Sequence, residues 1–521
     1  ERFRLADNEQ TFWQLAELPT SAPDTLGERF VQYLQRALRQ PAPLTDPADV
    51  AWFLASYARE ALARIEHRGL PGLVQIRKAL EETLGLTFEG ERGDHFFRST
   101  LVQTLFYGVF SSWVLWCKQQ PAGTNERFDW HDAQWSLHVP VINVLFEQVA
   151  TRSRLEPLGL VDVLDWAGDA LNRVQRDSFF ARFEEEHAVQ YFYEPFLEAF
   201  DPELRKQLGV WYTPPEVVKY MVTRVDTVLR QELGRPDGFA DPDVYVLDPC
   251  TGTGSYPIEV LRHVAETLRA KGEDALSGDD LKRAALHRIV GFEILPAPFV
   301  VAHLQIGLLL QQHGAPLSTT GNERAAIYLT NALTGWHTGA AHHEQIAFPE
   351  LETERDAADQ IKRRRPILVI LGNPPYNGYA GVAVAEERVL SDAYRVARTT
   401  KQPQGQGLND LYVRFFRMAE RKIVELTGEG IVCLISNYSW LDGLSFTAMR
   451  ERFLDEFDSI RIDCLNGDKY KTGKLTPDGQ PDPSIFSTER NREGIQVGTA
   501  IALMVRKKRH VPSRTVLFRH L

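Results

Sequence analysis

The chain has 521 residues, of which 43% are hydrophobic and 25% charged, an ordinary composition for a soluble globular protein of roughly three domains. The net charge of −11 counts against a DNA-binding chain, although a local basic face can bind phosphates on an acidic protein. Four cysteines (Cys117, Cys250, Cys433, Cys464) exclude a disulfide framework and show no metal spacing, which, with no recognisable signal peptide, favours the cytoplasm.

The first 200 residues are predicted to be helical. Asp46 and Pro47 form a helix start, with a capping acid and a first-turn proline. Apolar residues then recur at helical spacing over 50–65, and the ranges 95–116 and 157–174 show a similar pattern. Nothing in this region points to catalysis, so we expect a scaffold or coupling domain.

The most apolar segment of the chain is 101–117. It contains Gln103, Ser111 and Ser112 and is too short to cross a membrane. We therefore expect a buried helix here and no membrane partner.

A loop at 209–216 leads into the second part of the chain. Thr213 to Glu216 has the pattern of a capping box, with Pro214 at the first helical position. The same loop is a candidate to hold part of a ligand, because it precedes a glycine-rich turn.

That turn reads Asp248-Pro249-Cys250-Thr251-Gly252-Thr253-Gly254, between a strand predicted at 244–247 and a helix from about Pro257. Glycines permit a tight turn and a close ligand approach. Dinucleotide-binding folds share a Gly-x-Gly turn, but here an acid precedes it and a third glycine at their spacing is lacking. Asp248 would repel a pyrophosphate, and it suits a cofactor with a cationic amino group or a sulfonium.

Two more strands are predicted to end in polar residues. Residues 289–294 include Glu293, which suits bidentate contact with ribose hydroxyls. A solvated glutamate at a strand end is an equal alternative. Residues 326–333 are predicted to form another strand with a polar terminus that includes Asn331.

The apolar run at 367–371 predicts a buried parallel strand that stops at Gly372-Asn373-Pro374-Pro375-Tyr376. Neither proline can donate a backbone hydrogen bond, so the strand ends there. Ligands of open α/β sheets bind at this carboxyl edge. A plain strand-ending turn is the alternative, since Asn-Pro is common in turns.

The tetrapeptide Asn373-Pro374-Pro375-Tyr376 suits chemistry on an exocyclic amine. Such an amine is a poor nucleophile, because its lone pair is delocalised into the ring or carbonyl. Two acceptors, the side-chain carbonyl of Asn373 and the backbone carbonyl of Pro374, can hold the nitrogen near a tetrahedral shape. Tyr376 offers a ring on which a base can stack, worth about 1–3 kcal/mol. Positioning and electrostatics would do most of the work.

The order of these motifs resembles the γ-class adenine-N6 DNA methyltransferases. Within that class the chain is most similar to the methyltransferase modules of Type ISP and Type IIG-like restriction-modification enzymes, and of phage-defence systems such as DISARM and BREX. The likeness runs from a helical lead-in at 191–197, through 411–412 and 430–435, to 485–486 and 498–501.

The resemblance implies roles for individual residues. S-adenosylmethionine would be bound by Tyr212 and Thr213 at its methionine part, Asp248, Pro249, Gly252 and Gly254 at its amino-acid end, Glu293 at the ribose and Asn331 near the adenine. Many relatives have an acid at the position of Asn331. A flipped-out adenine of double-stranded DNA would be held by Asn373, Pro374, Pro375 and Tyr376, with Phe486 packing against it.

The last part of the chain completes the sheet. Three further strands, seven in all, are predicted at 430–436, 460–465 and 498–506. The loop at 401–408 is expected to lie over the DNA. Basic runs at 362–365 and 506–509 are candidates for phosphate contacts, although most such runs are solvated surface.

Three short motifs are set aside. Residues 467–474 contain Gly-Lys, but the spacing is wrong for a phosphate loop and Leu475 stands where Ser or Thr is needed. The Glu420-Arg421-Lys422 triplet lies in a helical pattern, where a nuclease would need a strand. His342-His343-Glu344 is interpreted as an exposed loop cluster rather than a metal site, so no metal is expected.

We therefore expect an α/β protein: a Rossmann-like, seven-stranded S-adenosylmethionine-dependent methyltransferase domain at 201–521, after a mostly helical domain at 1–200. A target-recognition domain would follow residue 521. The expected function is adenine-specific DNA methylation for host protection, in the cytoplasm, with restriction or defence subunits as partners. The alternatives are methylation of RNA or of a protein glutamine, and a cofactor-binding coupling subunit.

Overall fold

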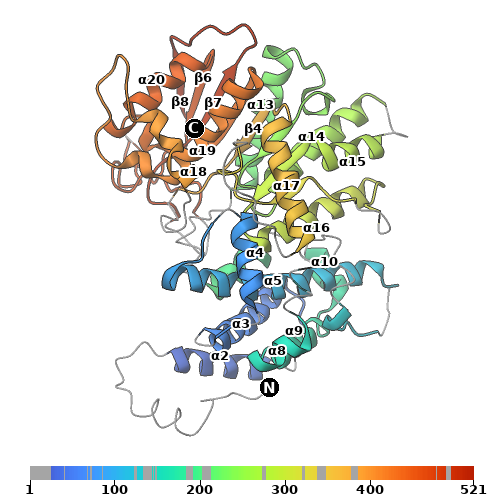
Figure 1. The fold of residues 1–521 in the computed structure, drawn as a ribbon. Helices are drawn as coiled ribbons and strands as arrows, with labels where there is room; N and C mark the ends of the chain where they lie inside the picture. Colours follow the sequence, from blue (N-terminus) through green and yellow to red (C-terminus); the bar gives the residue numbers. More distant parts are fainter. Residues whose placement is uncertain are drawn as a thin grey trace. The chain divides into compact units, whose positions relative to one another are not determined.

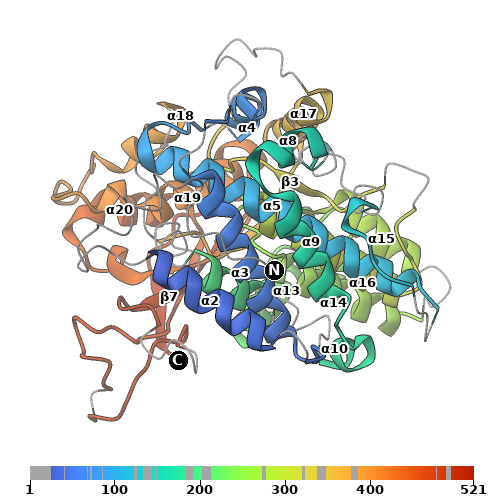
Figure 2. The ribbon, with the colours of Figure 1, turned by 90° about the horizontal axis from the view of Figure 1, so that it is seen from below.

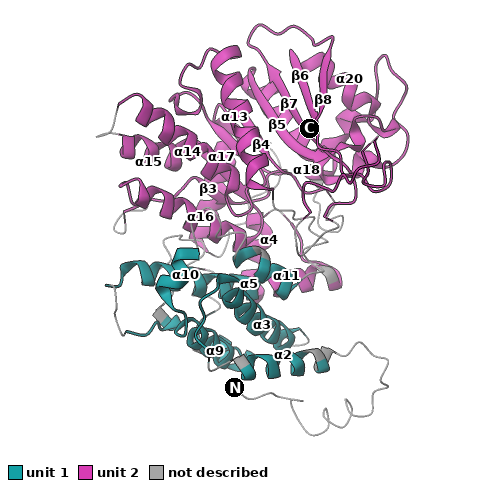
Figure 3. Cartoon of the chain, turned by 180° about the vertical axis from the view of Figure 1, so that it is seen from behind, with its two compact units in different colours: residues 1–72, 101–137, 146–202 teal, residues 73–100, 138–145, 203–521 magenta. Residues whose placement is uncertain are grey.

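The computed structural model describes residues 25–521 except 40–41, 67–68, 71–72, 85, 122–125, 133–143, 145, 147–149, 183–191, 202–212, 273–276, 319–322, 337–347, 377–384, 477 and 488–493. The chain forms two compact units (Figure 3). Unit 1 comprises Glu1–Gly72, Leu101–Leu137 and Phe146–Pro202, and unit 2 comprises Leu73–Thr100, His138–Leu145 and Glu203–Leu521. The sequence predicted a division at residue 200. The units differ from it because Leu73–Thr100 and His138–Leu145 belong to unit 2.

Unit 1 is helical among its described residues. It contains α2 (Thr25–Arg39), α3 (Pro47–Ile65), most of α5 (Gly90–Gln119), the short η2 (Trp130–Asp132), α8 (Arg152–Leu158), α9 (Val161–Leu171), α10 (Arg176–Arg182) and α11 (Glu194–Phe200). Asp46 caps α3 as predicted, because its side chain accepts a hydrogen bond from the Ala48 N–H at 2.8 Å. The single helix predicted at 157–174 is wrong, because Gly159 has φ 68° and ends α8 there.

Helix α5 is longer than predicted. It has 30 residues, and its part Gly93–Gln119 is long and apolar enough to cross a membrane. However, 89% of its most apolar window is buried inside the protein, as in the core helix of a soluble protein. Phe110 stacks on Phe192 with ring centroids 3.5 Å apart, and Tyr107 meets Phe196 edge-on at 4.8 Å. The predicted burial is therefore confirmed, and the predicted length is wrong.

Unit 2 is built on one mixed sheet. Its strands are β1 (Val246–Asp248), β2 (Ile289–Glu293), β3 (Ile327–Leu329), β4 (Val369–Gly372), β5 (Gly430–Asn437), β6 (Ser459–Cys464), β7 (Thr499–Arg506) and β8 (Val516–His520). The spatial order is β3-β2-β1-β4-β5-β7-β6-β8, and β7 alone runs antiparallel to its neighbours. All seven predicted strands are confirmed. The eighth was missed because β8 is exposed along its whole length and shows no buried face.

Helices cover both faces of this sheet (Figures 1 and 2). The helices of unit 2 are α4 (Val74–Leu84), α13 (Pro215–Glu232), α14 (Ser255–Ala270), α15 (Ser277–His287), α16 (Pro296–Gln312), α17 (Pro349–Arg364), α18 (Ala385–Arg388), α19 (Leu411–Glu420) and α20 (Thr447–Glu456). Short 3₁₀ segments are η4 (Gly238–Ala240), η5 (Leu390–Tyr394), η6 (Gly407–Asn409), η8 (Tyr438–Trp440) and η9 (Leu444–Phe446), and η7 (Arg421–Thr427) is a π-helix. Helices α14, α15 and α16 pack on one another, and residues of α17, α19 and α20 share a buried core with strand residues such as Ile370 and Val432. The fold is thus the predicted doubly covered α/β sheet.

The sheet brings the two main motifs side by side. β1 lies between β2 and β4, with Leu247 opposite both Val290 and Ile370. The strand order reverses between β1 and β4, and such a switch point opens a crevice at the carboxyl ends of the strands. The turn after β1 and the Asn-Pro-Pro-Tyr turn after β4 both leave the sheet at this edge.

Candidate active site at the carboxyl edge of the sheet

Asp248 is a buried carboxylate at the end of β1. It is 1% exposed, and its Oδ1 accepts a hydrogen bond from the Cys250 N–H at 3.1 Å. Its Oδ2 is buried and has no hydrogen-bond partner among the described residues. Burial raises the pKa of Asp248 to about 8; the Cys250 hydrogen bond opposes this shift and the Glu293 charge adds to it. A buried acceptor of this kind suits a cationic ligand group, which would satisfy it.

The glycine turn after Asp248 is open to a ligand. Gly252 has φ 56°, a conformation that favours glycine, and a side chain there would meet nothing within 4 Å. Gly254 has φ 98° and precedes α14, which begins at Ser255. Gly372, at the end of β4, approaches the same turn so closely that a Cβ there would lie 2.7 Å from Asp248 Oδ1. The two turns are therefore in direct contact.

Glu293, at the end of β2, braces the glycine turn. Its Oε2 accepts the Gly252 N–H at 2.7 Å, and its Oε1 accepts the N–H groups of Ile294 and Leu295, both at 2.9 Å. Burial raises the pKa of Glu293 to about 7, against the lowering effect of these hydrogen bonds. This structural role was not foreseen from the sequence, and the solvated alternative is excluded because the side chain is buried. Its predicted contact with the ribose stays a prediction.

Asn331, after β3, is buried and has both ends of its amide engaged. Its Oδ1 accepts the Leu333 N–H at 2.9 Å, and its Nδ2 donates to Glu387 Oε2 at 3.4 Å. Lys362 of α17 donates to the Asn331 carbonyl at 2.9 Å and to Thr330 Oγ1 at 2.8 Å. Its pKa is lowered to about 8, chiefly by burial.

The residues that hold this loop were missed or misread in the sequence. Lys362 belongs to the basic run at 362–365, which was weighed only as surface or as a phosphate site; its side chain is 1% exposed. Glu386 of α18 accepts the N–H groups of Gly335 and Trp336 at 2.9 and 3.1 Å. The acidic pair Glu386-Glu387 gave no signal, because α18 is too short for a periodic pattern.

Asn373 is anchored by the loop before α13. Its Nδ2 donates to Thr213 Oγ1 at 3.0 Å. The predicted capping box is wrong, because α13 begins at Pro215, its cap residue is Pro214, and no side chain caps it. The Thr213 hydroxyl instead accepts from Asn373, which joins the predicted cofactor loop to the predicted target turn. Tyr212 lies outside the described residues.

Tyr376 and Phe486 form an aromatic pair. Their ring centroids are 6.4 Å apart at 82°, although 110 residues separate them in the sequence. Tyr376 is 7% exposed and Phe486 3%, so a base that stacks on Tyr376 must enter beside this contact. The Tyr376 hydroxyl is buried and has no hydrogen-bond partner among the described residues.

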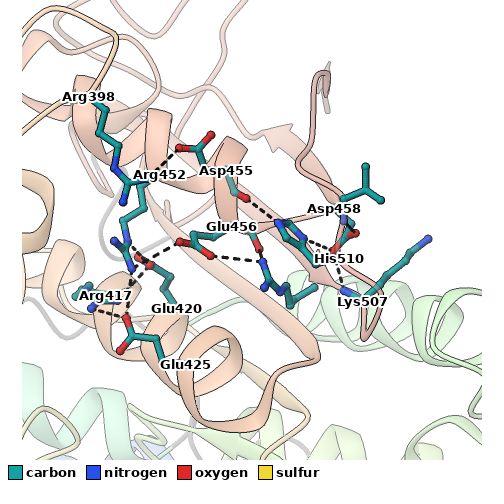
Figure 4. Close-up of polar contacts among 12 residues, drawn as sticks. Arg398, Arg417, Glu420, Glu425, Arg452, Asp455, Glu456, Asp458, Lys507 and His510 are labelled. Atoms are coloured by element: carbon teal, nitrogen blue, oxygen red, sulfur yellow. Dashed lines mark hydrogen bonds and ion pairs between the residues drawn. The ribbon is translucent and has the colours of Figure 1, made fainter.

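The motifs that were set aside have structural explanations where they are described. At 467–474 the backbone N–H groups of Tyr470 and Lys471 bind the Asp468 carboxylate at 2.7 and 2.6 Å, where a phosphate loop would present its amides to a ligand. Glu420 is 0% exposed and accepts hydrogen bonds from Arg417 and Arg452 (Figure 4). It also accepts one from the Tyr394 hydroxyl. The His342-His343-Glu344 cluster lies outside the described residues. In the part of the chain that the structure describes, no group of three or more His, Cys, Asp or Glu could hold a metal ion.

Comparison with known proteins agrees with this geometry. Residues 184–406 match the family model of the N-6 DNA Methylase. Among curated proteins no match is found. The ATP-dependent Type ISP restriction-modification enzyme LlaBIII bound to DNA aligns with TM-score 0.65 and 20% identity, over 91% of this chain and 30% of that one.

Two further solved structures are similar. A nuclease-deletion mutant of the Type ISP restriction-modification enzyme LlaGI, in complex with a DNA substrate mimic, aligns with TM-score 0.64 and 19% identity, over 92% of this chain and 36% of that one. The DrdV-DNA complex aligns with TM-score 0.63 and 20% identity, over 91% and 42%. The chain thus spans less than half the length of each of these structures, and at such identity they establish the fold alone. The resemblance identified in the sequence is therefore confirmed: residues 184–406 match the N-6 DNA methylase family, within a fold like that of the Type ISP restriction-modification enzymes.

Proposed function

We propose that this protein transfers a methyl group from S-adenosylmethionine to the N6 amino group of adenine in DNA. One observation carries the proposal. Asp248 ends β1 and the turn 373–376 follows the adjacent strand β4, so both lie at the same edge of the sheet, with Gly372 packed against Asp248. Oδ2 of Asp248 has no hydrogen-bond partner among the described residues. The match of 184–406 to the N-6 DNA methylase model supports this reading.

The described residues fit S-adenosylmethionine. Asp248 Oδ2 is a buried acceptor that the cofactor's ammonium group would pair with, and Gly252 leaves the backbone open for its amino-acid end. Gly254 instead packs closely against Ala302 of α16, where a Cβ would lie 3.3 Å from the Ala302 backbone. Glu293 and Asn331 end the next two strands of the sheet, where the ribose and adenine would lie. When bound, the cofactor would supply an electrophilic methyl group. The protein would supply position and charge.

Asn373 and Pro374 would activate the target amine. Thr213 accepts a hydrogen bond from the amide nitrogen of Asn373, and this contact supports the opposite atom, the carbonyl oxygen, as the acceptor. That oxygen and the Pro374 carbonyl would accept the two amine hydrogens and localise the nitrogen lone pair. The proton can leave after transfer, so the site needs no strong base.

The target adenine would reach this site only outside the duplex. Flipping a base costs a few kcal/mol, which contacts with Tyr376 and Phe486 would offset. The substrate would be double-stranded DNA in the cytoplasm. Host protection in restriction-modification or phage defence, with restriction or defence subunits as partners, is the setting we propose.

The test is transfer from methyl-labelled S-adenosylmethionine to mixed-sequence DNA, RNA and protein, followed by digestion and identification of the labelled unit. We expect N6-methyladenine from DNA. Label in RNA or in glutamine would overturn the assignment of DNA as the substrate. Cofactor binding without label in any acceptor, using the full-length protein, would overturn the enzymatic reading in favour of a coupling subunit.

A further inference from the structure

The connection between β6 and β7 lies at the same edge as the candidate active site. β6 is parallel to β4 and β5, because each of β5 and β6 is antiparallel to β7 and β4 is parallel to β5. The connection at 465–498 therefore starts at the carboxyl edge of the sheet and returns to it. It also carries Phe486, which contacts Tyr376. Through Phe486, the connection thus contacts the Asn-Pro-Pro-Tyr turn.

One part of this connection, residues 469–474, is basic and aromatic; we call it the basic loop. Its sequence is Lys-Tyr-Lys-Thr-Gly-Lys and contains no acid. Lys469 and Lys471 are exposed, and Tyr470 is 72% exposed, the most exposed aromatic side chain among the described residues. An exposed ring between two cations, on a protein with net charge −11, is unusual enough to need an explanation.

The basic loop is held in place by the buried Asp468 and the partly exposed Gln496. Asp468 accepts the N–H groups of Tyr470 and Lys471 through Oδ1, and that of Gly498 through Oδ2 at 3.0 Å. The Tyr470 hydroxyl donates to Gln496 Oε1 at 2.6 Å. The backbone of the loop and the far end of the ring are thus both fixed. A preorganised ring loses little conformational freedom when a partner stacks on it.

The charges of the loop are accessible to a partner. Lys471 pairs with Asp442 at 2.8 Å and lies over the Tyr438 ring, with the two charged side chains 45% and 68% exposed. An exposed pair of this kind contributes little stability, so a phosphate can displace it. The nearest acid in sequence, Asp468, binds three backbone N–H groups and so orients the backbone of the loop.

We propose that the basic loop binds the DNA next to the target adenine, with its lysines on backbone phosphates and the Tyr470 ring against a base or sugar exposed when the adenine leaves the helix. This proposal rests on the proposed function and names a second contact of the same site. Lysines with an interleaved aromatic ring are the combination that binds unstacked nucleic acid.

The same sheet provides a matched control. β7 runs antiparallel, so its last residue, Arg506, lies at the edge opposite the candidate active site, and the exposed Lys508 and Arg509 follow it. This position favours solvated surface, the alternative for the basic run at 506–509, over contacts with the phosphates next to the target adenine. The double variant Lys508→Gln/Arg509→Gln removes two exposed cations, as does Lys469→Gln/Lys471→Gln. The two pairs differ in the edge of the sheet from which they project.

The experiment measures DNA affinity of the full-length protein by fluorescence anisotropy over a range of salt concentrations. Tyr470→Ala is expected to weaken binding by about 5- to 100-fold, and Tyr470→Phe, which keeps the ring, by only a few-fold. Lys469→Gln/Lys471→Gln is expected to reduce the slope of log affinity against log salt by about 2. Lys508→Gln/Arg509→Gln should leave affinity and slope unchanged. Cofactor affinity should stay unchanged in all four, which would show that each variant is folded.

The outcomes separate this proposal from the proposed function. If the wild-type protein methylates DNA, and Tyr470→Ala and Lys469→Gln/Lys471→Gln both bind DNA with wild-type affinity, the proposal for the basic loop is overturned and the proposed function stands. Equal losses in the two double variants would also overturn it, because the effect would then be general charge. Wild-type protein that neither binds nor methylates DNA would overturn both proposals.

Discussion

Two buried carboxylates of unit 2 have opposite surroundings. Glu420, between α19 and η7, accepts from two arginines and a tyrosine hydroxyl, and the arginines continue the network to Glu425 (Figure 4). Asp248, at the end of β1, has one backbone hydrogen bond, and among the described residues no cation pairs with it. Burial raises the pKa of both acids, but for Glu420 the arginines oppose it.

Under the proposed function, the difference separates a group that stabilises the fold, Glu420, from one that would bind a ligand, Asp248. A buried charge with its cations in place contributes to structure, and removing one member leaves the others uncompensated. A buried acid without a cation costs stability in the free protein, and this cost is typical of functional sites. The variants below test whether the distinction holds.

The largest effect is expected outside this pair, at the target turn. Asn373→Ala should lower the rate of methyl transfer by about 10²- to 10³-fold or more, because it removes an acceptor that acts on the reacting amine. Cofactor affinity should stay within a few-fold of wild type. Single-turnover kinetics and calorimetry measure the two quantities. Native-rate transfer by this variant would refute the assignment of the site.

Glu420→Ala should destabilise the protein by about 2–3 kcal/mol, because Arg417 and Arg452 lose their buried partner. The loss is smaller than for an isolated pair, because both arginines keep Glu425. Denaturant unfolding measures it. Cofactor affinity of the folded variant should be unchanged. Weaker cofactor binding by this variant would contradict a purely structural role for Glu420.

Asp248→Asn should weaken cofactor binding without destabilising the protein, the reverse of what we expect for Glu420→Ala. Cofactor binding is expected to weaken by about 10- to 100-fold, because the amide cannot pair with an ammonium group as a carboxylate does. The free protein should become more stable near neutral pH. The folded-state pKa is raised above the unfolded value, so the wild-type acid loses stability as pH rises from about 4 to about 8, and the amide does not. Unchanged affinity would refute the cofactor half of the site.

The smallest effect is expected at Lys362. Lys362→Met removes two hydrogen bonds that hold Thr330 and the loop at Asn331, and should weaken cofactor binding by roughly 3- to 10-fold. Lys422 is a matched control, because it is a second buried lysine whose Nζ donates to a backbone carbonyl, that of Lys362. Lys422→Met should cost stability with cofactor affinity unchanged. Equal effects of the two variants on the cofactor would show that Lys362 acts only through general stability.

The sequence was a good guide to the buried strands and to the turns that end them. Seven strands, the turn at Asp248 and the turn at Asn373 all follow from apolar runs that stop at glycine or proline. Strand β8 was missed because Val516–His520 lies exposed at the sheet edge, and the break at Gly159 was missed because its neighbours keep a helical pattern.

The contacts that make the site were harder to predict. Thr213 looks like a helix cap, and only the fold shows that its hydroxyl meets Asn373, 160 residues later. Glu293 and Lys362 brace turns from other strands, and no spacing in the sequence encodes such pairings. The family resemblance placed both Tyr376 and Phe486 against the target adenine, and their direct contact with each other was not predicted.

The most direct test of the site is the pH dependence of cofactor binding, measured by titration calorimetry in two buffers of different ionisation enthalpy. If Asp248 pairs with the cofactor's ammonium group, it must lose a proton on binding below its pKa of about 8. The account predicts proton release at pH 6.5 and affinity that rises with pH from 6 to 7.5, by up to about tenfold per unit. Both effects should become smaller in Asp248→Asn, in which Glu293, with a pKa of about 7, is the remaining buried acid of the site. Affinity that is flat with pH, without proton release, would contradict the account.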